Sequence, residues 1–190
     1  MSNDPARRRA TYEDLLAVPP TQVAEIIDGE LVVSPRPGGA HTAAATAITI
    51  QIGGMFSRGG GGSSGGWWIM AEPELHFGAE ILVPDLAGWR RERMPVYPDS
   101  PFVELAPDWV CEVISTSTQG WDRVHKVPLY AAMGVKHAWL VDPRARTLEV
   151  LRLEGGHWVL AGAFDGDAEV RAEPFESFAL PLRLLWDRGG

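Results

Sequence analysis

The sequence has a single cysteine, Cys111, among its 190 residues. A lone cysteine excludes an intrachain disulfide and a zinc site built from cysteine ligands. No apolar run approaches the length of a membrane span. The polar first ten residues, with Arg7-Arg8-Arg9, also lack the apolar core of a secretory signal. We therefore expect a cytoplasmic protein without a membrane partner.

The sequence also lacks an excess of positive charge. Its 17 Lys and Arg residues are outnumbered by 25 Asp and Glu residues, which gives a net charge of −8. Surfaces that bind nucleic acid are usually basic because they face phosphate. The composition therefore argues against strong non-specific DNA binding, although a divalent metal and a local basic patch can offset an acidic total.

A glycine-rich segment at residues 59–66 lacks the features of a phosphate-binding loop. It consists of six glycines and two serines, with no Gly-Lys-Ser/Thr ending, and it does not open a helix. We expect a flexible loop there and no nucleotide cofactor.

The rest of the chain has the composition of an ordinary globular domain, with 45% hydrophobic and 22% charged residues. We expect a disordered basic arm at residues 1–10 and a single domain at residues 11–190.

The pattern of apolar residues, caps and turns predicts mixed secondary structure. Helices are expected at 11–18, 41–56 and 122–133, strands at 67–77, 81–90, 109–115 and 137–141, and hairpins at 24–33 and 147–163. This order favours an α/β fold of the α+β kind, with a mixed central sheet and helices on its faces. The strand–helix–strand unit at 109–141 should form a right-handed parallel crossover.

Two carboxylates stand out on the expected strands. Glu112 is the only charge in an apolar strand and shares a face with Val110 and Ile114. A buried carboxylate must be paired, protonated or bound to a cation, so Glu112 is either a metal ligand or the partner of an arginine. Asp85 follows Pro84 between apolar neighbours. It is either a second ligand or an aspartate that caps a turn.

A third chemical group comes from the helix that follows Glu112. Asp122, Lys126 and Tyr130 are spaced four residues apart and share one helix face. An ordinary ion pair with an aromatic neighbour would give the same pattern. Because this short helix must pack back over the sheet, Lys126 can reach the end of the Glu112 strand.

Two carboxylates, a backbone carbonyl and water satisfy the preference of Mg²⁺ for hard oxygen ligands. We expect Asp85, Glu112 and the carbonyl of Val113 to bind Mg²⁺, with Mn²⁺ able to substitute. Lys126 would stabilise the charge of a phosphodiester under attack, or orient the attacking water.

Six segments in this order resemble the Uma2 family, formerly DUF820, in the PD-(D/E)XK restriction-endonuclease-like superfamily. They are Glu25-Ile-Ile-Asp-Gly-Glu-Leu-Val-Val-Ser-Pro, His41, Val83-Pro-Asp85, Pro107-Asp-Trp-Val-Cys-Glu-Val-Ile-Ser115, Asp122-x-x-x-Lys126-x-x-x-Tyr130 and Gly134-Val-Lys-His-Ala-Trp-Leu-Val-Asp142. The resemblance spans roughly residues 11–160.

The resemblance implies a restriction-endonuclease-like αβββαβ core, here with an N-terminal helix and β-hairpin and a C-terminal β-hairpin. It also implies metal binding by Asp85 and Glu112. The lysine that the superfamily carries two residues after the second acid is replaced by Ile114. Lys126 is its substitute, as the resemblance to Uma2 sequences indicates.

Accessory site residues are less specific. Glu30 and His41 flank the entry to the first long helix, where superfamily members often carry an extra acid. Glu30 could equally be an exposed hairpin residue, and His41 a helix cap. Glu74 lies on a strand with alternating polar residues, for which a solvated face is the simpler interpretation.

The leading function is a Mg²⁺-dependent nuclease, a hydrolase that cleaves phosphodiester bonds in DNA. The alternative is a catalytically weak or inactive nuclease-fold protein that acts by binding nucleic acid or a protein partner. A small-molecule phosphoesterase is a third option. We also expect a homodimer, with the C-terminal hairpin and the Trp186 segment as the apolar contact surface.

Overall fold

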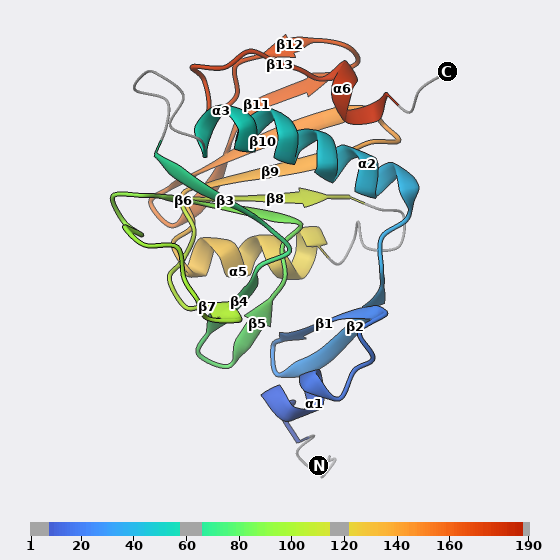
Figure 1. The fold of residues 1–190 in the computed structure, drawn as a ribbon, viewed down its shortest axis with the longest axis vertical. Helices are drawn as coiled ribbons and strands as arrows, with labels where there is room; N and C mark the ends of the chain where they lie inside the picture. The colour runs from blue at the N-terminus through green and yellow to red at the C-terminus, as the bar shows by residue number, and fades with distance from the viewer. Residues whose placement is uncertain (1–7, 58–65, 115–121, 188–190) are drawn as a thin grey trace, which may run out of the picture.

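The computed structural model describes residues 8–57, 66–114 and 122–187. The fold is a mixed α+β fold in which two sheets and a small two-stranded ribbon are connected by short helices (Figure 1). The expected fold class is therefore confirmed. None of the described helices is long and apolar enough to cross a membrane.

The larger sheet has six strands in the order β11-β10-β9-β8-β6-β3. Their bounds are β3 (Trp67–Ala71), β6 (Leu86–Arg90), β8 (Trp109–Val113), β9 (His137–Asp142), β10 (Thr147–Glu154) and β11 (His157–Asp165). Strands β8 and β9 are parallel, as expected for the crossover, and the other neighbouring pairs are antiparallel.

The smaller sheet has five strands in the order β2-β1-β5-β4-β7. Their bounds are β1 (Gln22–Ile27), β2 (Glu30–Pro35), β4 (Glu74–Phe77), β5 (Glu80–Leu82) and β7 (Phe102–Val103). The β1–β2 hairpin turns at Asp28 and Gly29, whose φ angles of 55° and 79° are those that a two-residue type I′ turn requires. A ribbon of β12 (Glu169–Val170) and β13 (Leu180–Pro181) lies near the C-terminus.

The helices cover both faces of the six-stranded sheet (Figure 1). The exception is α1 (Tyr12–Leu16), which packs against β1 of the smaller sheet. The other helical elements are α2 (Gly39–Ile48), the π-helical turn η1 (Thr49–Gly53), α3 (Gly54–Phe56), the π-helical turn η2 (Asp122–Lys126), α5 (Val127–Ala132) and α6 (Arg183–Trp186). Buried side chains of α2 pack with Trp109 and Cys111 on one face of β8. Tyr130 of α5 packs with Val110 on the other face. The alternation along β8 expected from its sequence is thus confirmed.

Two of the expected strands are wrong as continuous elements. The 67–77 segment breaks between β3 and β4 at Glu72-Pro73, where Glu72 has a φ of 47°. The 81–90 segment breaks between β5 and β6 at Val83-Pro84-Asp85. Proline cannot donate to a strand ladder, and a positive φ ends an extended run. At these breaks the chain passes between the two sheets, and the Glu72 amide donates to the Asp85 carbonyl at 3.0 Å.

Other segments differ less from expectation. The described part of the expected N-terminal arm, residues 8–10, lies against the β1–β2 hairpin, with the Ala10 amide 2.9 Å from the Gly29 carbonyl. The proline-rich connection before β8 contains the short strand β7. Residues 1–7 of the arm, most of the expected glycine-rich loop and Ser115 lie outside the described residues.

Candidate active site

Asp85 lies where the chain enters the six-stranded sheet, one residue before β6. One oxygen of its carboxylate, Oδ2, accepts a hydrogen bond from the Val113 amide at 2.7 Å. The other, Oδ1, lies 3.1 Å from Nε2 of His41, the third residue of α2. The side chain keeps 15% of its surface exposed. Asp85 is therefore held in place and still open to solvent.

Glu112 projects from the neighbouring strand β8, one residue before the one that binds Asp85. Only 3% of the residue is exposed. Its Oε1 atom accepts a hydrogen bond from the Tyr130 hydroxyl at 2.5 Å and lies 2.8 Å from Nζ of Lys126. Glu112 therefore lies within β8, whereas Asp85 lies one residue before β6, the strand that pairs with β8, and Glu112 is the more buried of the two.

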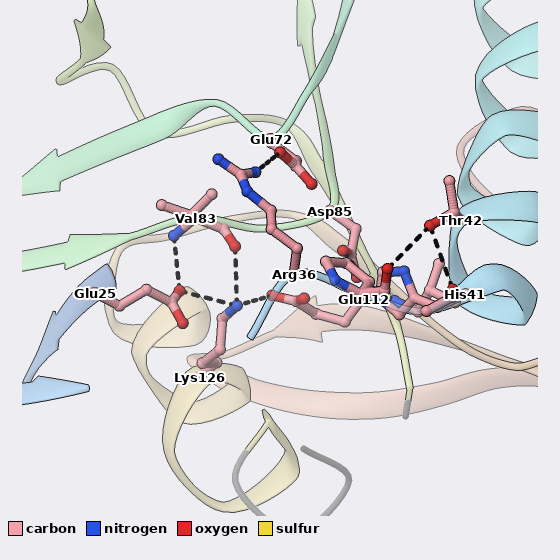
Figure 2. A network of polar contacts seen from close by, with 12 residues as sticks. Glu25, Arg36, His41, Thr42, Glu72, Val83, Asp85, Glu112 and Lys126 are labelled. Atoms are coloured by element: carbon pink, nitrogen blue, oxygen red, sulfur yellow. Dashed lines mark hydrogen bonds and ion pairs between the residues drawn. The ribbon is translucent and has the colours of Figure 1, made fainter. Parts of the chain in front are cut away.

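Lys126 reaches the site from the last residue of η2 (Figure 2). Its Nζ atom lies 2.8 Å from Glu112, 3.0 Å from Oε1 of Glu25 and 3.1 Å from the Val83 carbonyl oxygen. The side chain is only 4% exposed. A buried ammonium needs such partners, because an isolated charge in this environment is costly.

Two pKa shifts report the charge around these carboxylates. Burial raises the pKa of the Cys111 thiol well above its usual value, and the negative charges of Asp85 and Glu112 raise it further. Burial likewise raises the pKa of the Tyr130 hydroxyl. The negative charge of Glu112 raises this pKa further, and the positive charge of Lys126 lowers it. Negative charge thus gathers around Cys111, and the phenol remains a hydrogen-bond donor.

His41 adds a buried polar atom at the edge of this site. Its Nε2 atom faces Asp85, whereas its Nδ1 atom is buried and has no hydrogen-bond partner within the described part of the chain. A buried nitrogen without a partner is uncommon in folded proteins.

A hollow of about 320 Å³ opens beside Asp85 and His41. Side chains of α2 form one wall, and the break between β3 and β4 contributes Ala71 and Glu72. Its described lining includes Thr42 and Thr46 and contains no Lys or Arg. The exposed side of Asp85 therefore faces a concave, mostly uncharged surface.

The donor set fits a hard divalent cation. Glu112 supplies carboxylate oxygens from β8 and Asp85 from the residue before the paired strand β6, and the charges of both act on Cys111. Across the described ranges, no group of three or more His, Cys, Asp or Glu side chains could hold a metal ion. Mg²⁺ is commonly bound through one or two carboxylates and keeps several waters. Two carboxylates are compatible with that mode of binding.

The accessory residues expected from the sequence divide into two groups. His41 and Tyr130 contact Asp85 and Glu112 directly. Glu30 is exposed at the tip of the β1–β2 hairpin, beside Arg8 and Arg9. Glu74 lies 2.7 Å from Nε2 of His76 in the smaller sheet. Asp122 begins η2, but its side chain lies outside the described part of the structure.

Glu25 was given no role by the sequence reasoning, yet it contacts Lys126. It lies in β1, is 7% exposed and belongs to the smaller sheet. A signal was present, because Glu25 is followed by Ile26 and Ile27. A single acid in a buried strand is the pattern that drew attention to Glu112.

Comparison with known proteins gives a family match and a structural match. The model of the Uma2 family, described as "Putative restriction endonuclease", matches residues 9–183. A crystal structure from Anabaena variabilis ATCC 29413, titled as a "putative nuclease belonging to DUF820", superposes with a TM-score of 0.73 at 25% sequence identity. The superposition covers 93% of this chain and 97% of that one. No curated protein matches the sequence.

Proposed function

Because the chain belongs to the Uma2 family, we propose that it is a metal-dependent nuclease that hydrolyses phosphodiester bonds in DNA, with Asp85, Glu112 and Lys126 as its catalytic residues. One observation carries the proposal. The Asp85 carboxylate is held by the Val113 amide, next to Glu112 in β8, and the buried ammonium of Lys126 lies 2.8 Å from Oε1 of Glu112. This combination supplies both anionic metal ligands and a cationic group for phosphate.

The residues that would hold Mg²⁺ are Asp85, Glu112 and, through its carbonyl, Val113, and Mn²⁺ would substitute. When bound, the cation would offset the charge of the scissile phosphate and acidify water in the site. The exposed side of Asp85 leaves room for water and for a phosphate group.

The chain's own side chains would orient the reacting groups. The Val113 amide fixes Asp85, and the Tyr130 hydroxyl fixes Glu112. The Lys126 ammonium would donate to the phosphate or to the attacking water, because it is the cation adjacent to Glu112. The hollow beside Asp85 would receive the substrate strand.

A second candidate is a protein that binds nucleic acid or a protein partner without cleaving. Two observations favour it. The net charge of −8 disfavours DNA as a substrate and so favours the form of this candidate that binds a protein partner, and Lys126 forms an ion pair with the carboxylate that a metal would need. An assay that scores retention and cleavage of DNA separately distinguishes the two candidates.

The test uses supercoiled plasmid and single-stranded DNA with MgCl₂ or MnCl₂. Wild type is compared with Asp85→Asn, Lys126→Met and the control Asp99→Asn, which removes an exposed carboxylate. We expect wild type and control to cleave, and the two site variants to lose at least about 100-fold in rate. Equal cleavage by all four preparations would mean a contaminating nuclease and would overturn the proposal. DNA retention without cleavage would support the binding candidate.

We also propose that the protein is a homodimer, since cutting both strands of a duplex calls for two sites. Strand β11 supports this arrangement because it lies at the edge of the six-stranded sheet. It exposes Val159 (39%) and Leu160 (57%). An apolar edge strand is suited to pairing with another copy of itself.

A further inference from the structure

Glu25 is a buried charged residue that has no role in the proposed mechanism. It lies in the smaller sheet, opposite Val32 in the β1–β2 hairpin. Its side chain is 9% exposed. Burying a carboxylate is unfavourable unless it is paired, so its partners indicate what it does.

Both partners of Glu25 belong to the site. Its Oε1 atom accepts a hydrogen bond from the Val83 amide at 2.7 Å and lies 3.0 Å from Nζ of Lys126. Val83 completes the arrangement, because its carbonyl oxygen lies 3.1 Å from the same Nζ atom (Figure 2). One carboxylate oxygen thus joins β1 to the lysine and to the segment that leads into Asp85.

Lys126 is held between two acids. An ammonium group has three hydrogens, and Glu25, Glu112 and the Val83 carbonyl are enough to accept all of them. A divalent cation on Glu112 would compete with the ammonium for that carboxylate and repel it. Glu25 lies on the far side of Lys126 from Glu112 (Figure 2) and is outside the set of proposed metal ligands.

We infer that Glu25 is a positioning residue that keeps the Lys126 ammonium beside the reacting groups when Glu112 binds the metal cation. This inference rests on the proposed function, because it needs a cation at Glu112. With Glu25 present, the ammonium keeps an anionic partner after the cation has replaced it at Glu112. Without that charge, the ammonium would associate more closely with Glu112 and compete with the cation for it.

The test is a double-mutant cycle of Glu25→Gln and Lys126→Met. Glutamine keeps an oxygen that can accept from the Val83 amide but removes the charge. The matched control is Glu80→Gln, since Oε2 of Glu80 likewise accepts from a backbone amide, that of Asp28, at 2.7 Å in the same sheet.

Mn²⁺ affinity is measured by calorimetry, without DNA. We expect Glu25→Gln to weaken Mn²⁺ binding about five- to tenfold, and Glu80→Gln to change it by less than about twofold. In the Lys126→Met background the effect of Glu25→Gln should shrink to about twofold or less, because no ammonium remains to compete. An equal loss in both backgrounds, or no loss in either, overturns the inference.

Urea unfolding without metal is measured for wild type, Glu25→Gln, Lys126→Met and the double variant. It separates this inference from the proposed function. Coupling between the two substitutions is expected, because the groups are in contact; strictly additive effects overturn the inference. If wild type binds no Mn²⁺, the proposed function fails, and the metal-linked role of Glu25 fails with it even where coupling is found.

Should Glu25→Gln not fold, Glu25→Asp replaces it, since the charge stays and the shorter side chain withdraws from Nζ. A several-fold loss of Mn²⁺ affinity is then expected, and unchanged affinity overturns the inference.

Discussion

The hydroxyl of Tyr130 lies 2.5 Å from Oε1 of Glu112, the same oxygen that faces Nζ of Lys126. Lys126 and Tyr130 are four residues apart, so one side of a single helical stretch holds one carboxylate. Because the pKa of the Tyr130 hydroxyl is raised, mainly by burial, the phenol donates its hydrogen across the ordinary pH range. Glu112 is thus fixed from the helix as well as from its own strand.

Tyr130→Phe should therefore destabilise the fold and impair the site. The variant removes a donor from a buried carboxylate, which typically costs about 1–3 kcal/mol. Urea unfolding measures the loss, and DNA cleavage should fall with it. Tyr97→Phe is the control, because Tyr97 is 52% exposed; we expect a change below about 0.5 kcal/mol there. Equal stability of the two variants would show that the Tyr130 hydroxyl contributes nothing.

Asp14 gives the fold a dependence on acidic pH. Its pKa is lowered from 3.8 to about 2, first by the side chain of Arg8 and then by the Thr11 amide. A carboxylate with a lowered folded-state pKa stabilises the fold above its unfolded value, and this contribution is lost as pH falls through the folded value. The stability difference between wild type and Asp14→Asn should therefore be present at pH 5 and close between pH 4 and 2.

Thermal unfolding across that pH range measures the Asp14 effect. Glu13→Gln in the same helix is the comparison, because Glu13 is exposed and lies outside the capping box. A difference for Asp14→Asn that persists unchanged down to pH 2 would contradict the assignment.

Gly88→Ala should destabilise the six-stranded sheet. A Cβ atom at Gly88 would lie 3.0 Å from Cδ1 of Ile69 and 3.1 Å from Cε3 of Trp109. Overpacking of this kind costs about 1–3 kcal/mol, measurable as a lower urea midpoint. Gly54→Ala is the matched control, since nothing lies within 4 Å of its added Cβ. Helix propensity predicts neutrality or a gain of up to about 1 kcal/mol for that control. If both variants behave alike, the close packing at Gly88 is not limiting.

Leu160→Lys should convert the proposed dimer to a monomer. The substitution places a charge on the exposed apolar part of β11, and edge-strand lysines oppose strand pairing. Light scattering of the purified protein reports the mass directly. Leu16→Lys is the control, because Leu16 is 63% exposed on α1, in a different part of the fold. A monomeric wild type, or a dimer that survives Leu160→Lys, would refute the assignment.

Local signals in the sequence were sufficient for several elements. Asp28-Gly29 predicted the hairpin because few residue pairs accept two positive φ angles. The lone charge in an apolar strand singled out Glu112, and four-residue spacing placed Lys126 and Tyr130 on one helix face, where both contact it. These predictions depend on nearest neighbours along the chain.

Long-range relationships were harder to predict. The pairing of Glu25 with Lys126 joins β1 to η2 across 101 positions of sequence, as the difference between their residue numbers gives. The expected strands at 67–77 and 81–90 are too long because the chain leaves the strand conformation at Pro73 and Pro84, within otherwise apolar segments. Proline within a strand pattern is a breaking signal, but which sheet the chain enters next depends on packing between distant elements.

Because the chain crosses repeatedly between its two sheets, there are few places where it could be cut into two fragments that still assemble. Strands β3, β6 and β8 of one sheet alternate along the sequence with β4, β5 and β7 of the other. A single cut between β3 and β8 would leave each fragment with an incomplete share of both sheets. The two sheets should therefore melt in one cooperative transition, and a split version of the protein would tolerate its break at the Gly155-Gly156 turn far better than anywhere between those strands.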